Sequence, residues 1–108
     1  MAGAASESEA ILVICSGQLE GTSHVLSAEE TLIGRAPTTQ IQLPDESISR
    51  EHAFLSYDEG EGAWVVEDLQ STNGTKLNGK RVRSASLGHG DIVQIGQTKL
   101  KFLLKIEG

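Results

Sequence analysis

Short runs of apolar residues, each followed by a turn signal, recur along this 108-residue chain. The last run, residues 98–106, is the most regular: Thr98, Leu100 and Phe102 alternate with lysines, and only Leu103 breaks the pattern. A period of two residues is typical of a strand with one buried face. Twelve glycines and only two prolines favour many turns and short strands over long helices. The chain is therefore predicted to be all-β.

The runs follow one another at the spacing of a β-sandwich or barrel. Residues 1–9 are small, polar or acidic, and we expect them to be a disordered tail or a cloning remnant outside a single domain of residues 10–107. The polar segment 58–62 has hairpin length, and Asn78-Gly79 favours a tight turn. Strands are expected at 10–15, 22–26, 31–34, 40–43, 52–57, 63–68, 75–77, 80–83, 92–95 and 98–106.

The formal net charge of −6 argues against a general nucleic-acid binder, which would present a basic face. Basic residues nevertheless cluster within eight positions, at Lys76, Lys80, Arg81 and Arg83. A locally positive rim on an acidic protein suits a small anionic partner. The alternative is that these residues are simply the solvated charges of a hairpin.

Cys15 is the single cysteine, so no disulfide can form within the chain and a reducing compartment is expected. Its position in the apolar run 11–15 suggests a small core residue rather than a nucleophile. The apolar runs are far shorter than a membrane span, and the N-terminus lacks the regions of a signal peptide. We therefore expect no membrane partner and a cytoplasmic location, or a nuclear one if the source is eukaryotic.

Arg35, Ser49 and Asn73 offer a cation, a hydroxyl and an amide from three separate loops. An arginine presents a planar fork of donors that matches phosphate oxygens, a hydroxyl can complete the shell, and an amide can bond a peptide backbone. In a hairpin of residues 52–57 and 63–68, Ser49 and the 70–74 loop lie at the same end. The intervening residues 36–48 can run in several ways, so this argument does not place Arg35.

Five motifs stand in a fixed order between Ile11 and Ile106: Leu32-Ile33-Gly34-Arg35, Ser49-Arg50-Glu51-His52, Ser71-Thr72-Asn73-Gly74-Thr75, Leu77-Asn78-Gly79 and Gly90-Asp91-Ile92-Val93-Gln94-Ile95-Gly96. Jointly they are specific, and with them the chain resembles a forkhead-associated (FHA) domain, a reader of phosphothreonine peptides. The resemblance implies a β-sandwich of about eleven mostly antiparallel strands, with the binding loops gathered at one end.

The resemblance also implies the site residues. Contacts to the phosphopeptide are expected from Arg35, Ser49, Arg50, Thr72, Asn73 and Asn78, with structural support from Gly34, His52 and Gly74 and a possible influence of Ser47 on residue preference. The implied function is recognition of phosphothreonine, the product of a Ser/Thr kinase, in a partner protein, and so a phosphorylation-dependent interaction in signalling. No cofactor or metal is expected, and the isolated domain is expected to be a monomer.

Two other functions are compatible with the sequence. A degenerate member of the family could use the same sandwich as a phospho-independent interaction or scaffolding domain. A small hydrolase using Ser49 and His52 is disfavoured, because no nucleophile-elbow motif is present and no acid is placed to orient the imidazole. His24 and His89 are scattered, without paired ligands at metal spacing, so neither an enzyme nor a metal site is expected.

Overall fold

Eleven β-strands, and no helix, make up the regular structure of the computed structural model over the residues it describes, 8–26 and 30–106. The strands are β1 (Ser8–Ile14), β2 (Ser23–Leu26), β3 (Glu30–Gly34), β4 (Ile41–Gln42), β5 (Ala53–Asp58), β6 (Ala63–Asp68), β7 (Thr75–Leu77), β8 (Lys80–Val82), β9 (Ser84–Leu87), β10 (Ile92–Ile95) and β11 (Thr98–Ile106).

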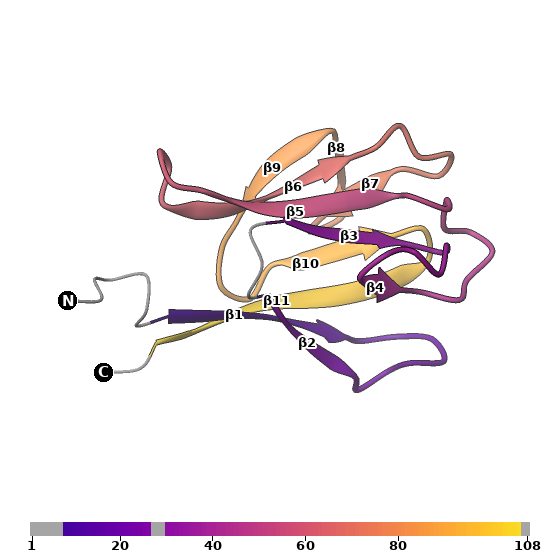
Figure 1. The fold of residues 1–108 in the computed structure, drawn as a ribbon, viewed down its shortest axis with the longest axis horizontal. Coiled ribbons are helices and arrows are strands. Elements are labelled where there is room, and N and C mark those ends of the chain that lie inside the picture. Colours follow the sequence, from indigo (N-terminus) through magenta and orange to yellow (C-terminus); the bar gives the residue numbers. More distant parts are fainter. Residues whose placement is uncertain (1–7, 27–29, 107–108) are drawn as a thin grey trace.

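The strands form two sheets that pack face to face (Figure 1). Sheet A has six strands in the order β2-β1-β11-β10-β7-β8, and sheet B has five in the order β4-β3-β5-β6-β9. Within the described residues, β3 and β4 form the single parallel pair and every other pair is antiparallel. The predicted sandwich of about eleven mostly antiparallel strands is confirmed.

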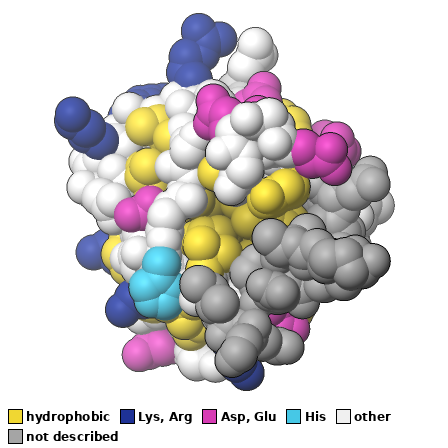
Figure 2. All heavy atoms as spheres, turned by 90° about the vertical axis from the view of Figure 1, so that its left-hand side faces the viewer, with side chains coloured by type: hydrophobic (Ala, Val, Ile, Leu, Met, Phe, Trp, Pro, Cys, Tyr) yellow, Lys and Arg dark blue, Asp and Glu magenta, His cyan; other side chains and the backbone are white. Residues whose placement is uncertain are grey.

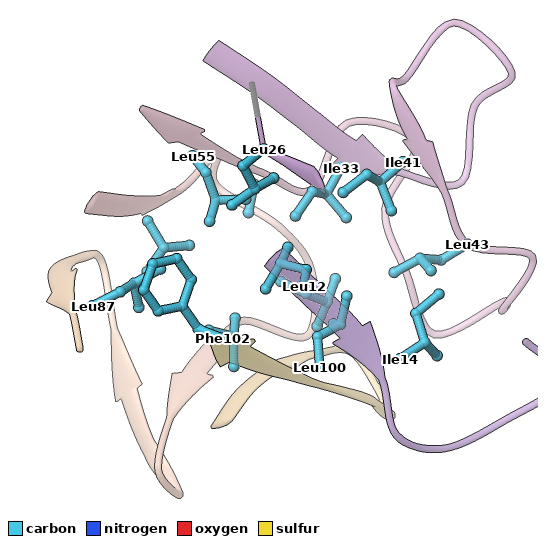
Figure 3. Close-up of a cluster of buried hydrophobic side chains, with 14 of the residues drawn as sticks. Leu12, Ile14, Leu26, Ile33, Ile41, Leu43, Leu55, Leu87, Leu100 and Phe102 are labelled. Carbon is cyan, nitrogen blue, oxygen red and sulfur yellow. The ribbon is translucent and has the colours of Figure 1, made fainter. Parts of the chain in front are cut away.

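The core lies between the sheets and is filled by the inward members of the alternating strands (Figure 3). Sheet A contributes Leu12 and Phe102, and sheet B contributes Ile33 and Leu55, all with at most 1% of their surface exposed. Burying side chains of this size contributes about 1.5–3 kcal/mol each to folding. The alternation seen in residues 98–106 therefore places one face of β11 against this core.

One strand escaped the sequence analysis. β9 has the sequence Ser-Ala-Ser-Leu, in which two apolar residues alternate with serines and no apolar run occurs. It pairs with β6, with Trp64 opposite Leu87. Another difference is that β1 begins at Ser8, so residues 8 and 9, expected in the tail, belong to a strand that pairs with the end of β11. Residues 1–7 and 107, also covered by the domain prediction, lie outside the described residues.

The expectation that Cys15 is a core residue is wrong. Its side chain is exposed, and it lies one residue beyond the end of β1. Ala10, Leu12 and Ile14 supply the inward side chains of this strand, so the alternation turns position 15 toward solvent. An apolar neighbourhood in sequence therefore did not imply burial here.

The two ends of the sandwich differ in character. Because Ala53 pairs with Asp68, the loops before β5 and after β6 lie at one end. The β5–β6 turn lies at the other end, where β1 begins and β11 ends (Figure 1). Figure 2 faces this second end and shows apolar side chains at its centre, with Lys and Arg mainly toward its left and upper margins. The loops that carry the predicted site residues are at the first end.

Candidate functional site

Backbone hydrogen bonds join the β3–β4 loop to the β4–β5 loop. The Arg35 amide donates to the Ser49 carbonyl at 3.0 Å, the Ala36 amide donates to the Arg50 carbonyl at 3.1 Å, and the His52 amide donates to the Ile33 carbonyl at 2.9 Å. Arg35 therefore lies beside Ser49, which the sequence argument alone could not place.

Gly34 makes this close approach possible. It is buried at the end of β3, and a Cβ atom built on it would overlap the carbonyl group of Arg50. Any larger residue would push the two loops apart, since a backbone carbonyl cannot move aside as the end of a flexible side chain can. The glycine that precedes the arginine in the motif therefore sets the separation between Arg35 and Ser49.

The guanidinium of Arg35 is held at one nitrogen and free at the others. Its Nε donates to the Ile48 carbonyl at 3.0 Å, and the residue is exposed. Within the described residues, the two terminal nitrogens donate no hydrogen bond and face no carboxylate. One anchored bond fixes the plane of the guanidinium, which leaves a directed fork of four N–H donors at the surface.

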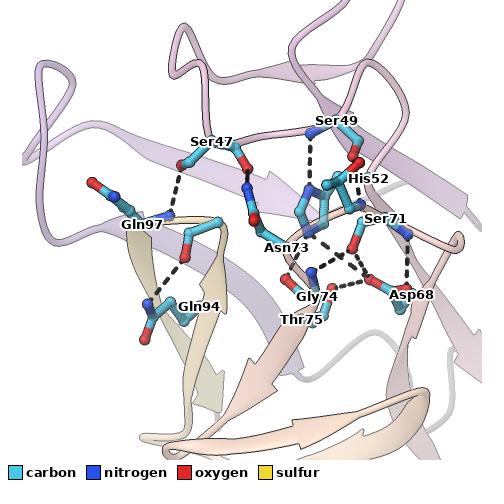
Figure 4. A network of polar contacts seen from close by, with 12 residues as sticks. Ser47, Ser49, His52, Asp68, Ser71, Asn73, Gly74, Thr75, Gln94 and Gln97 are labelled. Atoms are coloured by element: carbon cyan, nitrogen blue, oxygen red, sulfur yellow. Dashed lines mark hydrogen bonds and ion pairs between the residues drawn. The ribbon is translucent and has the colours of Figure 1, made fainter.

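Ser49 connects its loop to the β6–β7 loop. Its Oγ accepts a hydrogen bond from the Thr72 amide at 3.1 Å, so the hydroxyl proton of Ser49 remains available for donation. The side-chain amide of Asn73 donates to the Ser47 carbonyl at 2.7 Å, which leaves its carbonyl oxygen and its second N–H (Figure 4). Thr72 and Asn73 are both exposed. The predicted proximity of Ser49 to the 70–74 loop is confirmed.

His52 lies beneath these loops, with none of its surface exposed. Its Nδ1 accepts the Ser49 amide proton at 3.1 Å, and the Gly74 carbonyl lies 2.8 Å from its Nε2. This network assigns the neutral tautomer with the proton on Nε2, which donates to Gly74. Both ring nitrogens are thereby used, so His52 has no nitrogen left to act as a base for the Ser49 hydroxyl.

Asp68 closes the turn that carries Asn73. Its carboxylate accepts hydrogen bonds from the Ser71 amide (3.0 Å), the Ser71 hydroxyl (2.6 Å) and the Thr75 hydroxyl (2.7 Å), while the Gly74 amide donates to Ser71 Oγ at 2.9 Å. Burial by itself raises the pKa of Asp68, but the hydrogen bonds from Ser71 and Thr75 outweigh it and hold the pKa below its ordinary value. The ionised carboxylate therefore stabilises this turn.

Ser47 links the β4–β5 loop to the β10–β11 turn. Its hydroxyl donates to Asp45 Oδ1 at 2.8 Å and accepts from the Gln97 amide at 2.9 Å. The amide and hydroxyl of Ser47, both donating to Asp45, are the main cause of a lowered pKa of that carboxyl group. A role of Ser47 in peptide preference stays a prediction, and the structure shows its hydroxyl engaged within the protein.

Arg50 and Asn78, which were also predicted to contact the peptide, differ in where they lie. Arg50 follows Ser49 and is exposed, with no ion-pair partner in the part of the chain that the structure describes. Asn78 lies at the other end of β7 from Asn73: its carboxamide donates to Asp91 Oδ1 at 3.1 Å and accepts from the Ile92 amide at 2.9 Å. The structure therefore places Arg50, but not Asn78, beside the three loops that carry Arg35, Ser49 and Asn73, which we call the loop cluster.

Sequence reasoning missed the residues that hold the loops, above all Asp45, Asp68 and Ser71. Their local signals were present, since Asp-x-Ser and Asp-x-x-Ser spacings allow an aspartate to accept hydrogen bonds from the amide and hydroxyl that follow. The long-range bond from the Gln97 amide to Ser47 has no comparable local signal.

Residues 8–26 and 30–106 show no metal-binding cluster and no membrane-spanning helix. No three His, Cys, Asp or Glu side chains there are grouped so that they could hold a metal ion. No helix in that part of the chain is long and apolar enough to cross a membrane. Every buried polar side-chain atom described there has a hydrogen-bond partner within the protein.

A comparison with protein-family models gives a match to the FHA domain over residues 31–96. This span contains the β3–β4, β4–β5 and β6–β7 loops. The chain belongs to the FHA domain family. The resemblance noted in the sequence is therefore confirmed.

Several bacterial proteins are similar to this FHA domain. The glycogen accumulation regulator GarA of Mycolicibacterium smegmatis is 42% identical over 94 residues, which are 87% of this chain and 58% of the relative. The oxoglutarate dehydrogenase inhibitor of Corynebacterium jeikeium is 37% identical over 97 residues, 90% of this chain and 66% of the relative. The FHA domain-containing protein FhaB of Mycobacterium tuberculosis is 42% identical over 91 residues, 83% of this chain and 57% of the relative. The chain thus spans less than two thirds of the length of these relatives.

Solved structures of FHA domains share the fold. A domain described in a study of phosphothreonine-dependent FHA domain interactions superposes with a TM-score of 0.79 at 29% identity, covering 88% of this chain and 95% of that one. The FhaA FHA domain in complex with the intracellular domain of Rv3910 gives a TM-score of 0.77 at 30% identity, covering 86% and 98%. EmbR of Mycobacterium tuberculosis, in complex with a low-affinity phosphopeptide, gives 0.79 at 31% identity, covering 93% and 25%.

Proposed function

We propose that this FHA domain binds a phosphothreonine-containing segment of a partner protein, so that a Ser/Thr kinase controls the interaction. The observation that carries the proposal is the hydrogen-bonded linkage of three loops, which presents Arg35, Ser49 and Asn73 together at one end of the sandwich. FHA domains of similar fold are described as phosphothreonine-dependent or in complex with a phosphopeptide, which supports the same function here.

In this proposal the phosphate is recognised by Arg35 and Ser49. A phosphothreonine carries nearly two negative charges and three acceptor oxygens. The free donors of the Arg35 guanidinium supply charge and bidentate geometry, and Ser49 donates its remaining proton. Thr72, whose amide bonds Ser49, and Arg50, which follows Ser49, are both exposed and add a hydroxyl and a second cation. Unphosphorylated threonine offers no negative charge to these donors, so the site discriminates between the phosphorylated and the unphosphorylated peptide.

Asn73 would fix the register of the peptide. Its bond to the Ser47 carbonyl holds the carboxamide in place, and its free carbonyl oxygen and N–H can pair with one residue of the ligand backbone. His52 and Asp68 support this by fixing the ends of the turn from below. Restraining a binding group before the ligand arrives reduces the entropy lost on association.

A regulatory rather than catalytic role follows from the same features. The relatives are named as a regulator and an inhibitor, and the buried, doubly bonded His52 removes the base that a Ser49 hydrolase would need. We propose that the domain directs a protein to phosphorylated partners, in the cytoplasm. The identity of those partners depends on residues around the phosphothreonine.

The test is calorimetric titration with a phosphothreonine peptide chosen from a degenerate library and with its unphosphorylated twin. We expect binding of the phosphorylated peptide only, and a loss of about 2–5 kcal/mol of binding free energy in Arg35→Ala, as for removal of one partner of a charge pair. Lys105→Ala is the matched control. It also removes one cation, but from the end of β11 that lies away from the binding loops. Equal affinity for both peptides would instead indicate a phospho-independent scaffold.

A further inference from the structure

The charges of the two sheets are segregated. The strands of sheet A contain six Lys or Arg residues and one acidic residue, Glu9, whereas the strands of sheet B contain four acidic residues and no Lys or Arg. A chain with 15 acidic and 9 basic residues thus places most of its cations in one sheet. Such a surface attracts anions although the protein as a whole is acidic.

A cationic row crosses the outer face of sheet A next to the binding loops. The register sets Arg81 opposite Lys76, Lys76 opposite Gln94, and Gln94 opposite Lys99, on four adjacent strands. Thr75, the neighbour of Lys76 in β7, is fully buried, so alternation along the strands directs this row outward. We call Arg81, Lys76 and Lys99 the cationic row.

Arg81 joins the cationic row to the proposed binding site. A Cβ atom placed on Gly74 would lie 2.5 Å from Arg81 Nε and 2.8 Å from its Cζ, so the guanidinium lies directly against the turn that carries Asn73. Gly74 itself has a φ of +86°, and its carbonyl accepts the proton of His52. The row is therefore continuous with the site rather than a separate patch.

No carboxylate of the described residues neutralises the cationic row. Within residues 8–26 and 30–106, no ion pair forms at Arg81, Lys76 or Lys99, although acidic residues outnumber basic ones in the chain. Like charges directly opposite each other on neighbouring strands destabilise a sheet. Arg81 and Lys76 form such a pair, and an anion from outside the chain would relieve the repulsion.

We infer that the cationic row binds acidic side chains of the same segment that carries the phosphothreonine. This inference rests on the proposed function and names the class of ligand: phosphothreonine with a flanking acidic stretch. Adjacent strands are about 4.8 Å apart, so the row spans about 14 Å, which an extended chain covers in roughly four to five residues. Lys101, in the next outward position of β11, extends the positive surface beyond the row.

The experiment compares two phosphothreonine peptides that have the same residues next to the phosphothreonine. One carries four Glu residues on its flank, and the other carries four Gln residues there, with the flank placed on each side in turn. Affinities are measured at about 50 and 300 mM salt, since exposed ion pairs are screened by salt. The row variant is the double substitution Lys76→Gln and Lys99→Gln. The matched control is the double substitution Lys80→Gln and Lys105→Gln, which gives the same net charge as the row variant.

We expect the Glu-flanked peptide to bind the wild-type domain about three to tenfold more tightly at low salt, the sum of two or three exposed ion pairs. The row variant should lose this preference and still bind the Gln-flanked peptide within about twofold of wild type, while the control keeps the preference. Equal affinities for the two peptides, or equal loss in the control, would overturn the inference and leave the proposed function intact.

Absence of binding to every phosphothreonine peptide would overturn the proposed function, and the inference with it. A further probe is a single-stranded oligonucleotide of about 20 nucleotides, because the same row could attract a phosphodiester backbone. Oligonucleotide binding that is lost in the row variant, without any preference for the Glu-flanked peptide, would contradict our inference and assign the face to nucleic acid. Arg81→Gln is measured separately, because Arg81 also touches Gly74 and its loss can alter the site itself.

Discussion

Replacing His52 by alanine would remove the side chain that joins the β4–β5 loop to the β6–β7 loop. The Ser49 amide would lose its acceptor and the buried Gly74 carbonyl would lose its donor. Leaving a buried polar group without a partner costs about 1–3 kcal/mol, and the emptied volume adds to this cost. We expect His52→Ala to lower the free energy of unfolding by about 3–5 kcal/mol, a large part of the 5–15 kcal/mol of a typical domain.

The assay is urea unfolding followed by the fluorescence of Trp64, the single tryptophan, which packs against the core. Two conservative variants separate the bonds from the packing. In His52→Asn the side-chain oxygen can still accept from Ser49, and in His52→Gln the amide can still reach the Gly74 carbonyl. Each should therefore lose less stability than His52→Ala.

The same variants should weaken phosphopeptide binding, since the loops they release carry Ser49 and Asn73. A change in unfolding free energy below about 1 kcal/mol in His52→Ala would refute the view that His52 braces the loops, because it is less than the cost of one orphaned buried group. Equal losses in all three variants would show that packing, and not the two hydrogen bonds, sets the contribution of His52.

Three other outcomes are expected. Gly34→Ala should lower the free energy of unfolding by about 1–3 kcal/mol, as for an overpacked site, because the methyl group overlaps the Arg50 carbonyl; unchanged stability with unchanged affinity would contradict the close approach. The pKa values of Asp45 and Asp68 lie below their ordinary value of 3.8, so the unfolded chain takes up protons at these carboxyl groups first. The stability that the two carboxylates contribute should be constant above about pH 5 and be lost as the pH drops through the lowered pKa values, so the unfolding free energy should fall less steeply there in Asp68→Asn. Phosphopeptide affinity should weaken below about pH 6, where phosphate takes its second proton, and a flat profile in folded protein would exclude recognition of the dianion.

Local patterns in the sequence were enough for every described strand except β9 and for part of the site. The hairpin signal at residues 58–62 predicted that Ser49 and Asn73 share one end, and the register of β5 with β6 confirms it. The position of Arg35 depended on two long-range backbone bonds, from its own amide to Ser49 and from the Ala36 amide to Arg50, which no local pattern encodes. Family resemblance supplied the missing step.

The misses have a common physical origin. β9 is a short strand in which only Ala85 and Leu87 are apolar, and it is stabilised by pairing with β6. Cys15 is exposed because the alternation of β1, and not the hydrophobicity of its neighbours, decides which side chains face the core. The cationic row likewise depends on the register of four strands, including the pairing of β7 with the non-consecutive β10, and only the 76–83 cluster could be seen beforehand.

The most direct test of the loop cluster as a phosphate site is a titration of ¹⁵N-labelled domain with the selected phosphothreonine peptide, followed by NMR. We predict saturable shifts at the Ser49, Arg50 and Thr72 amides, the Asn73 side-chain amide and Arg35 Nε, and none of comparable size with the unphosphorylated peptide. Shifts confined to the β5–β6 turn, or the same shifts with both peptides, would contradict the account.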